Sequence, residues 1–232
     1  MMNADLKIDF IVMAAGSSRR FGSNKLLYPI QGRPVYSYVL EQVELAVEKL
    51  SVSPAVMDSC KGGICQKVPV GAFCRVFVVS RFEEILREAE IKGWQAVYSP
   101  ESESGVSWTI KNGIAAAGRQ SDYYMFLTSD QPCLQASSIV RLVQETLAAG
   151  KGIGSMCWQG QPGNPVIFYR KYLPELLSLE GDTGGRKVAG KHPEDCFFCH
   201  AGQKEELEDA DRPEAMEIIL DYIKKLDYTG KM

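Results

Sequence analysis

The sequence is poor in histidine, has no excess of positive charge, and contains no long apolar run. Its 232 residues include 26 Lys and Arg against 29 Asp and Glu, a net charge of −3. Because nucleic-acid binding rests on a basic surface, this balance argues against nucleic acid as a partner. No apolar run approaches the roughly 20 residues that a membrane helix requires, and the first ten residues lack the pattern of a signal peptide. We therefore expect a cytoplasmic protein without a membrane partner.

The cysteine pattern gives no sign of a disulfide framework. There are seven cysteines, an odd number without a secretory signal, so we expect reduced thiols. The spacing of Cys196, Cys199 and His200 could suit zinc. However, residues 196–200 alternate like a strand, which favours buried structural thiols.

Apolar segments of strand and helix character alternate along the chain. This alternation predicts an α/β fold, a mostly parallel sheet with helices on both faces. The two strands beside the turn-rich QGQPGNP are too close for a helical crossover, so part of the sheet is expected to be antiparallel. We expect Ser137 to be the N-cap of the helix after SDQP. The predicted strands are 10–13, 75–80, 94–98, 123–127, 153–158, 166–169 and 196–200, and the predicted helices are 34–50, 82–91, 107–117, 137–149, 171–179 and 213–226.

Residues 51–73 interrupt this alternation. They lack periodicity and contain Pro, Gly and two Cys, in a place where a short turn would suffice. We expect an inserted loop, with a short element of its own as one alternative. No linker is evident elsewhere, so residues 1–232 are expected to form a single domain.

The stretch MAAGSSRRFGSNK, residues 13–25, follows the apolar run at Phe10–Val12. Its spacing fits neither the dinucleotide fingerprint nor the P-loop, because Gly16 and Gly22 are six apart and Lys25 lies three beyond Gly22. A turn of small residues still presents backbone N–H groups to an anion, and its Arg and Lys side chains can bind a polyphosphate. The loops after Tyr98 and Leu127 also follow strands, so all three should converge on one sheet edge.

The line AAGSSRRFGSNKLLYPIQGRPVYSYVL closely resembles the opening signature of the MobA-like nucleotidyltransferases. The resemblance implies a Rossmann-like three-layer α/β/α fold of the nucleotide-diphospho-sugar transferase type. It also implies catalytic roles for Arg19, Arg20, Lys25 and Asp130. The implied nucleotide-binding residues are Ala14, Ala15, Gly16, Ser17, Ser18 and Lys25 in the loop, with Gly105 and Thr109 in the later ESGVSWTIKNG segment.

Further segments resemble later motifs of the same family. LTSDQPCL resembles its Asp-Gln-Pro motif and EDADRPEAM its last acidic motif, which implies Mg²⁺ on Asp130 and Asp211, with Asp209 beside them. QPGNPVIF matches a Gly-His-Pro segment, although Asn164 replaces the usual His. GDTGGR resembles the subgroup that modifies molybdopterin. The implied acceptor-binding residues are Gly163, Asn164, Pro165, Asp182, Gly184 and Arg186.

These resemblances imply transfer of a nucleotide to a phosphorylated acceptor, with release of pyrophosphate. The attacking phosphate is already anionic, which agrees with the presence of only two histidines, both far from the loops. In this family an Ala-Ala-Gly loop goes with cytidine, so Ala15 implies CTP. The molybdenum cofactor cytidylyltransferases are the nearest subgroup, with molybdopterin as acceptor. The alternatives are transfer to a sugar or polyol phosphate, and a nucleotide-binding accessory protein without turnover that serves a molybdenum hydroxylase.

Overall fold

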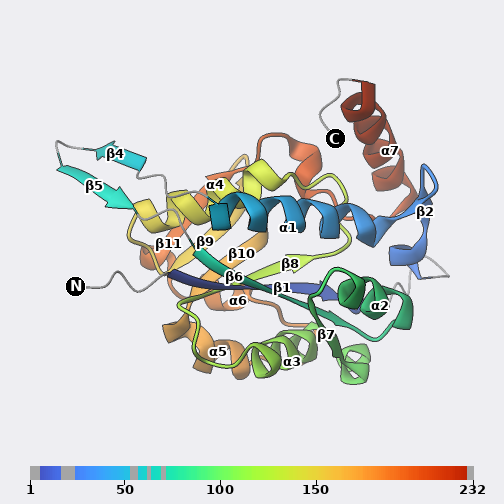
Figure 1. Ribbon diagram of the computed structural model, residues 1–232, viewed down its shortest axis with the longest axis horizontal. Helices are drawn as coiled ribbons and strands as arrows, with labels where there is room; N and C mark the ends of the chain where they lie inside the picture. Colours follow the sequence, from blue (N-terminus) through green and yellow to red (C-terminus); the bar gives the residue numbers. More distant parts are fainter. Residues whose placement is uncertain (1–5, 17–23, 53–56, 62–63, 69–71, 229–232) are drawn as a thin grey trace.

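The protein is described by a computed structural model that covers residues 6–16, 24–52, 57–61, 64–68 and 72–228 (Figure 1). Its strands are β1 (Leu6–Ala14), β2 (Pro29–Ile30), β3 (Arg33–Pro34), β4 (Met57–Lys61), β5 (Ile64–Val68), β6 (Ala72–Ser80), β7 (Gln95–Tyr98), β8 (Tyr123–Thr128), β9 (Ile153–Trp158), β10 (Gln161–Tyr169) and β11 (Cys196–His200). Its α-helices are α1 (Val35–Val52), α2 (Glu83–Ile91), α3 (Val106–Ala117), α4 (Ala136–Ala148), α5 (Leu173–Leu177), α6 (Arg186–Ala189) and α7 (Pro213–Tyr228).

The central sheet has seven strands in the order β11-β9-β10-β8-β1-β6-β7. The pairs β1–β6, β1–β8, β6–β7 and β9–β11 are parallel, whereas β10 is antiparallel to both of its neighbours. The mostly parallel sheet and the antiparallel pair around QGQPGNP are therefore confirmed. All strands except β10 point their carboxyl ends to one edge, which is where ligands bind in such sheets.

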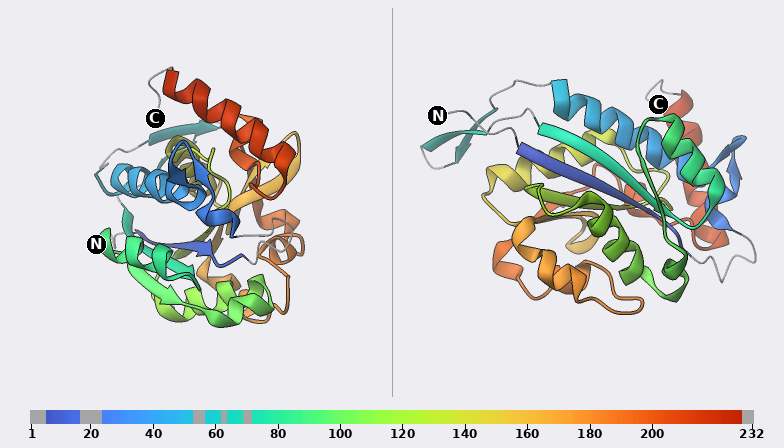
Figure 2. Two further views of the ribbon diagram at one scale, coloured as in Figure 1. Left: turned by 90° about the vertical axis from the view of Figure 1, so that its right-hand side faces the viewer. Right: turned by 60° about the horizontal axis from the view of Figure 1, so that its bottom comes forward.

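Helices cover both faces of the sheet, giving three layers (Figures 1 and 2). Side chains of β1 alternate: Ile8, Phe10 and Val12 pack with α1, α2 and α4, while Ile11 packs with α3, α5 and α6 on the opposite face. This period of two is the pattern of a strand buried on both sides. The three-layer α/β/α fold expected from the sequence is confirmed. Helix α7 forms a smaller cluster against α1 through Met216, Ile219 and Ile223.

Several local expectations differ from the structure. Helix α4 starts at Ala136 with Gln135 as its N-cap, and the Gln135 side chain makes no capping hydrogen bond, so the prediction of Ser137 as N-cap is wrong. The predicted helix at 171–179 is a 3₁₀ turn, Arg170–Tyr172, followed by the shorter α5. Within residues 51–73, β4 and β5 form an antiparallel hairpin that projects from the body (Figure 1). No helix in the described part of the chain is long and apolar enough to span a membrane.

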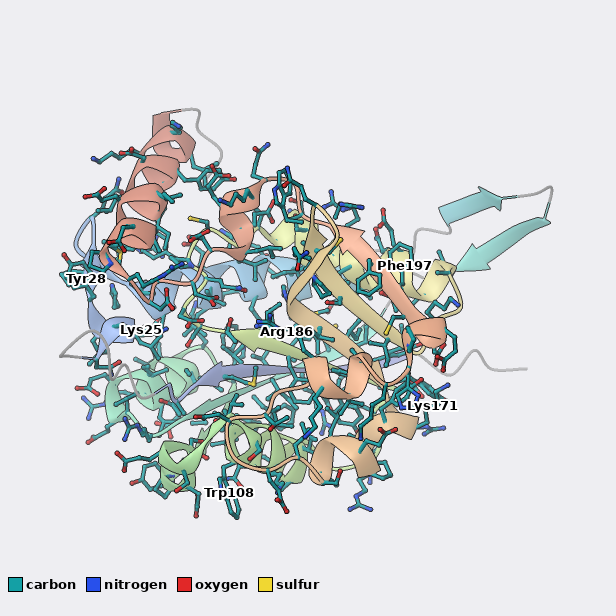
Figure 3. All side chains as sticks on the ribbon, turned by 180° about the vertical axis from the view of Figure 1, so that it is seen from behind. Lys25, Tyr28, Trp108, Lys171, Arg186 and Phe197 are labelled. Carbon is teal, nitrogen blue, oxygen red and sulfur yellow. The ribbon has the colours of Figure 1, made fainter. Side chains whose placement is uncertain are left out.

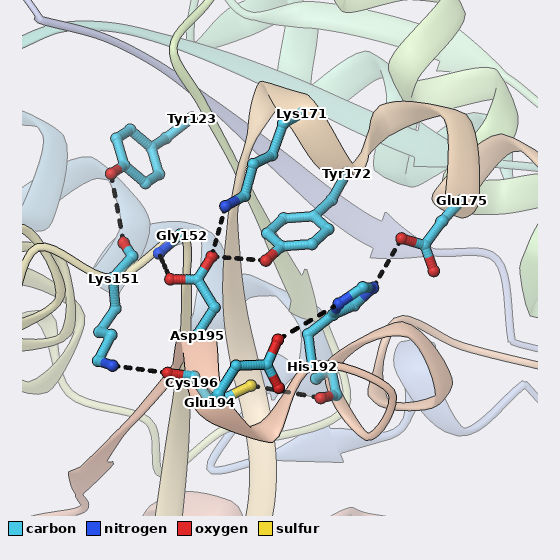
Figure 4. A network of polar contacts seen from close by, with 11 residues as sticks. Tyr123, Lys151, Gly152, Lys171, Tyr172, Glu175, His192, Glu194, Asp195 and Cys196 are labelled. Carbon is cyan, nitrogen blue, oxygen red and sulfur yellow. Dashed lines mark hydrogen bonds and ion pairs between the residues drawn. The ribbon is translucent and has the colours of Figure 1, made fainter.

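A polar network joins the strands at the amino edge of the sheet, opposite the carboxyl ends (Figure 4). The carboxylate of Asp195, just before β11, accepts hydrogen bonds from the Gly152 N–H at 2.9 Å and the Tyr172 hydroxyl at 2.5 Å, and pairs with Lys171 at 2.7 Å. Burial alone would raise the pKa of Asp195, but the bonds from Lys171, Tyr172 and Gly152 outweigh it and lower the pKa to about 2. Through these bonds, Asp195 links the start of β11 to the start of β9 and to the segment after β10.

Replacing Asp195 should remove part of the pH dependence of stability. Because the folded-state pKa of about 2 lies below the ordinary 3.8, the carboxylate stabilises the fold above about pH 4, and this contribution is lost as the pH falls toward 2. Asp195→Asn should lower the free energy of unfolding at neutral pH by about 1 kcal/mol, because Lys171 is half exposed and solvent screens the pair. Urea unfolding at pH 7, 4 and 2.5 checks this, with the exposed Asp221→Asn as control. An equal loss of unfolding free energy at all three pH values, or an equal loss in Asp221→Asn, would contradict this stabilising role of the Asp195 carboxylate.

Candidate nucleotide-transfer site

Three loops at the carboxyl edge of the sheet enclose a cavity of about 390 Å³. They follow β1, β7 and β8, so the predicted convergence of these loops is confirmed. The lining residues are Met13, Ala15, Gly16, Lys25, Leu26, Ser102, Glu103, Ser104, Val106, Thr109, Thr128, Ser129, Asp130 and Asp182. Backbone N–H groups, hydroxyls, a cation and carboxylates thus face one space, as binding of a polar, charged ligand requires.

The first loop enters this cavity directly from β1. Ala14 is the last residue of β1 and is fully buried, whereas Ala15 and Gly16 line the cavity. Ser17, Ser18, Arg19 and Arg20 lie outside the described residues. The chain is described again from Asn24, whose side-chain oxygen accepts the Leu26 N–H at 3.1 Å and caps the 3₁₀ turn Lys25–Leu27. This cap fixes the direction in which Lys25 leaves the backbone.

Lys25 and Asp130 form a close pair at the floor of the cavity. The Lys25 Nζ donates to Asp130 Oδ2 at 2.6 Å, and the two side chains are only 12% and 19% exposed. The second oxygen, Asp130 Oδ1, is buried and has no hydrogen-bond partner in the described part of the protein. Figure 3 places Lys25 at the same end of the molecule as Tyr28, with Lys171 at the other end. The predicted cation and the predicted carboxylate are therefore brought together across 105 residues of chain.

Asp209 lies beside this pair. The Gln131 amide Nε2 donates to Asp209 Oδ1 at 2.9 Å, and the Ala210 N–H donates to the Asp130 carbonyl at 2.8 Å. Burial and then the negative charge of Asp130 raise the pKa of Asp209 to about 6, although the Gln131 bond and Lys25 oppose the shift. Asp211 contributes only weakly to this shift, and its carboxylate is paired with Arg212 at 3.3 Å. Asp209 is therefore near enough to Asp130 to be affected by its charge.

Buried polar atoms without a hydrogen-bond partner gather at this same edge. Such atoms are rare in native proteins, and a cluster of them marks a place where a ligand, ion or water completes the bonding. In the described ranges they are Asn24 Nδ2, Arg81 Nε, Ser107 Oγ, Thr128 Oγ1, Asp130 Oδ1 and Gln131 Oε1. Thr128 ends β8 and Asp130 and Gln131 follow it, Arg81 follows β6, Asn24 directly precedes the 3₁₀ turn Lys25–Leu27, and Ser107 lies in the first turn of α3.

The residues around Asp130 fit a magnesium ion held partly by substrate. Among the described residues, no group of three or more His, Cys, Asp or Glu side chains is placed to hold a metal by itself. Mg²⁺ needs no such group, since one or two carboxylates and phosphate oxygens suffice. The unpartnered Oδ1 of Asp130 and the raised pKa of Asp209 are what two carboxylates show where a cation can bind.

The start of α3 forms another wall of the cavity. Gly105, its N-cap, has φ of +137°, and a β-carbon there would overlap the backbone of Gly181 and Asp182. The Ser107 N–H donates to the Gly181 carbonyl at 3.1 Å, which ties the GDTGGR turn to α3. Asp182, expected among the acceptor-binding residues, consequently lines the first cavity. The Thr109 hydroxyl also lines it and donates to Ser102 Oγ at 2.8 Å.

A second cavity of about 520 Å³ lies beside the first. Of the predicted acceptor-binding residues, Gly163 and Arg186 line it; Asn164 and Pro165 follow Gly163 in β10, and Gly184 lies in the turn before α6, but none of these three lines either cavity. Gln131 and Asp209 line this second cavity, whereas Asp130 lines the first. The two cavities therefore meet at these three residues. The full lining is Gln131, Trp158, Gln159, Gln161, Pro162, Gly163, Arg186, Lys204, Leu207, Glu208 and Asp209.

Comparison with known proteins agrees with this geometry. The model of the MobA-like NTP transferase domain matches residues 10–196. The chain belongs to this family. It is therefore a nucleotidyltransferase, as the resemblance of its first loop implies.

Two curated relatives and one solved structure are similar to this MobA-like chain. The purine catabolism protein PucB of Bacillus subtilis is 25% identical over 224 residues, covering 90% of this chain and 94% of that protein. A probable molybdenum cofactor guanylyltransferase of Thermococcus kodakarensis is 31% identical over 120 residues, 38% of this chain and 60% of that protein. Rv0371c of Mycobacterium tuberculosis has a TM-score of 0.72 at 20% identity, with 94% and 98% of the two chains covered. The mycobacterial protein has also been solved with manganese. At this identity, the structural likeness shows the fold alone.

Sequence reasoning missed several residues of the two cavities. Trp158 and Lys204 line the second cavity, but neither belongs to a motif that the sequence analysis identified. Gln131 could have been found, since it lies next to Asp130 in the SDQP segment. The role of Asp209 in contacting Gln131 depends on tertiary packing and leaves no spacing signal.

Proposed function

We propose that this nucleotidyltransferase transfers CMP from CTP to the phosphate of molybdopterin and releases pyrophosphate. One observation carries the proposal: two cavities, lined by different predicted substrate residues, meet at Lys25, Asp130, Gln131 and Asp209. A reaction between two bound phosphates needs such a junction. Nucleotide in the first cavity and acceptor in the second would bring the attacking oxygen next to the α-phosphorus.

The chemistry requires positioning and charge neutralisation more than proton transfer. The acceptor phosphate oxygen attacks the α-phosphorus of CTP, the new P–O bond forms, and the bond to the β-phosphate oxygen breaks. Lys25, with Arg19 and Arg20, would stabilise the negative charge that develops on departing pyrophosphate. Asp130 and Asp211 would hold Mg²⁺, with Asp209 beside them. When bound, Mg²⁺ supplies charge to the reacting phosphate oxygens.

The choice of base rests on Ala15. It is 2% exposed and lines the first cavity beside Gly16. An Ala-Ala-Gly loop favours CTP, whereas the Thermococcus relative is named a guanylyltransferase. The other nucleotide contacts would come from Ala14, Gly16, Ser17, Ser18, Gly105 and Thr109.

The choice of acceptor rests on the second cavity and on the molybdenum-cofactor name of that relative. Gly163 and Arg186, which line this cavity, would bind the acceptor there; of the other expected acceptor residues, Asp182 lines the first cavity, and Asn164, Pro165 and Gly184 line neither. Trp158 also lines the second cavity and would stack on a planar heterocycle. A molybdenum hydroxylase would then be the client of the product.

A substrate panel tests the proposal. The protein is incubated with Mg²⁺, each of the four NTPs, and molybdopterin or a polyol phosphate, while pyrophosphate release is followed. We expect release only with CTP and molybdopterin. Turnover only with GTP would overturn the choice of base, and turnover only with a polyol phosphate would overturn the choice of acceptor. Nucleotide binding without any release would favour the accessory-protein alternative.

Arg186→Met should raise the KM for the acceptor by about tenfold, because an exposed charge-assisted bond to phosphate is worth about 1.5 kcal/mol. The KM for the nucleotide should change by less than about twofold, since Arg186 lines only the second cavity. Steady-state kinetics with each substrate varied in turn checks this. Lys187→Met, its exposed neighbour in α6, is the control and should leave both values unchanged. An equal rise for both substrates in Arg186→Met would contradict the division between the cavities.

A further inference from the structure

The pair between Lys25 and Asp130 has two features that a simple surface ion pair lacks. Both side chains are mostly buried, and the bond of 2.6 Å joins the two groups that the proposed reaction needs elsewhere. Lys25 is needed at the nucleotide phosphates, and Asp130 is needed at the divalent cation. In the structure these two side chains bond each other.

Charge balance explains why they pair. Asp209 lies beside Asp130: its Oδ1 accepts a hydrogen bond from the Gln131 amide at 2.9 Å, and the N–H of the next residue, Ala210, donates to the Asp130 carbonyl at 2.8 Å. Two neighbouring carboxylates out of bulk water repel each other unless a cation stands between or beside them. Lys25 supplies that cation, because its Nζ bonds Asp130 Oδ2 directly at 2.6 Å. The Lys25 ammonium group therefore neutralises carboxylate charge that a metal ion would otherwise neutralise at the same place.

We propose that Lys25 and the divalent cation compete for Asp130, so that cation binding releases Lys25 to the nucleotide phosphates. The proposal rests on the proposed nucleotide transfer and adds to it a coupling between the two ligands. Nucleotide alone must take Lys25 from Asp130 and leave two carboxylates uncompensated. The cation alone must displace a bonded lysine. When nucleotide and cation bind together, Lys25 pairs with the phosphates and the cation pairs with the carboxylates. Each ligand should therefore raise the affinity of the other.

The experiment measures Mn²⁺ binding in the absence of nucleotide, by the loss of the free-ion EPR signal. Lys25→Met removes the competing charge and should bind Mn²⁺ about tenfold more tightly than wild type, within the range of ordinary coupling. Lys25→Arg keeps the charge and should remain within about threefold of wild type. Lys92→Met is a matched control, because Lys92 is 19% exposed and also forms a 2.6 Å pair, with Glu44, and neither residue lines either cavity. It should leave Mn²⁺ affinity unchanged.

A second measurement covers the possibility that Lys25→Met folds poorly. CTP binding is titrated by calorimetry in EDTA, with Asp130→Asn in place of the lysine variant. Here Lys25 no longer faces a charged partner, so CTP should bind about fivefold more tightly than to wild type. Glu44→Gln, which removes the partner of Lys92, should show no change.

The results separate this coupling from the reaction itself. Equal or weaker Mn²⁺ binding by folded Lys25→Met, or unchanged CTP binding by Asp130→Asn in EDTA, overturns the competition while leaving nucleotide transfer intact. If no variant binds Mn²⁺ at all, both the competition and the metal role of Asp130 are overturned. Turnover with the full substrate set is measured separately, so failure of the proposed function is seen there.

Discussion

Asp130→Asn is expected to release pyrophosphate at least about 100 times more slowly than wild type, a loss of about 3 kcal/mol of transition-state stabilisation. Asp130 follows β8 at the floor of the first cavity, where it pairs with Lys25 and leaves one oxygen without a partner. The amide keeps the size of the side chain but removes the negative charge that would hold the divalent cation. A continuous pyrophosphate assay at saturating CTP and acceptor gives kcat directly.

The same variant should not lose nucleotide binding, and this separates a chemical defect from general damage. Because the side chain at position 130 is then neutral, binding of the phosphates by Lys25 no longer breaks an ion pair. The affinity for CTP without metal is therefore expected to rise. Glu44→Gln provides the matched control, since Glu44 forms a pair of the same 2.6 Å length with Lys92 away from the cavity. It should retain wild-type kcat. Asp130→Asn with kcat within about threefold of wild type would mean that this carboxylate does not take part in the reaction.

Gly105→Ala is expected to lower the free energy of unfolding by about 4 kcal/mol, combining backbone strain with overpacking. Gly105 has φ of +137°, which L side chains rarely adopt, and a methyl group there would overlap the backbone of Gly181 and Asp182. The GDTGGR turn would have to move away from α3, breaking the bond from the Ser107 N–H to the Gly181 carbonyl. Nucleotide affinity should fall with it, because Val106, Thr109 and Asp182 line the first cavity.

Gly118→Ala is the control that separates the effect of backbone strain from the effect of the close contact between Gly105 and Gly181. Gly118 also has a positive φ, +77°, but nothing lies within 4 Å of an added β-carbon. Only the backbone cost of about 1–3 kcal/mol applies there. Chemical unfolding and calorimetric CTP titration of the two variants check the difference. Equal losses of stability in both would show that the contact between Gly105 and Gly181 does not constrain the fold.

The elements of the sheet were predictable because strongly apolar strands determine their own positions. RVFVVS and YYMFLT lie in β6 and β8, and the loops after strands meet at one edge because parallel strands end there. Lys25 and Asp130 were selected on other grounds, because MAAGSSRRFGSNK and LTSDQPCL resemble motifs of the family, and the structure brings the two side chains together.

Features that depend on tertiary packing were not predictable from local sequence. The helix after SDQP begins one residue before Ser137, and the N–H of its first residue, Ala136, donates to the side chain of Gln42 in α1 at 2.9 Å, a tertiary contact that local sequence does not indicate. The contact of Asp209 with Gln131 joins segments 78 residues apart, and the second cavity combines a β9–β10 hairpin tip with residues 204–209. The β4–β5 hairpin within residues 51–73 lacks the alternation that identifies strands.

Transfer of the α-phosphate of CTP is the most direct test of this account. The protein is incubated with Mg²⁺, molybdopterin and CTP labelled at the α-phosphorus, and the products are separated. The account predicts that the label moves to the acceptor, that unlabelled pyrophosphate appears in equal amount, and that Asp130→Asn slows both at least about 100-fold. Label recovered only in CTP, or pyrophosphate formed without any labelled acceptor, would contradict it.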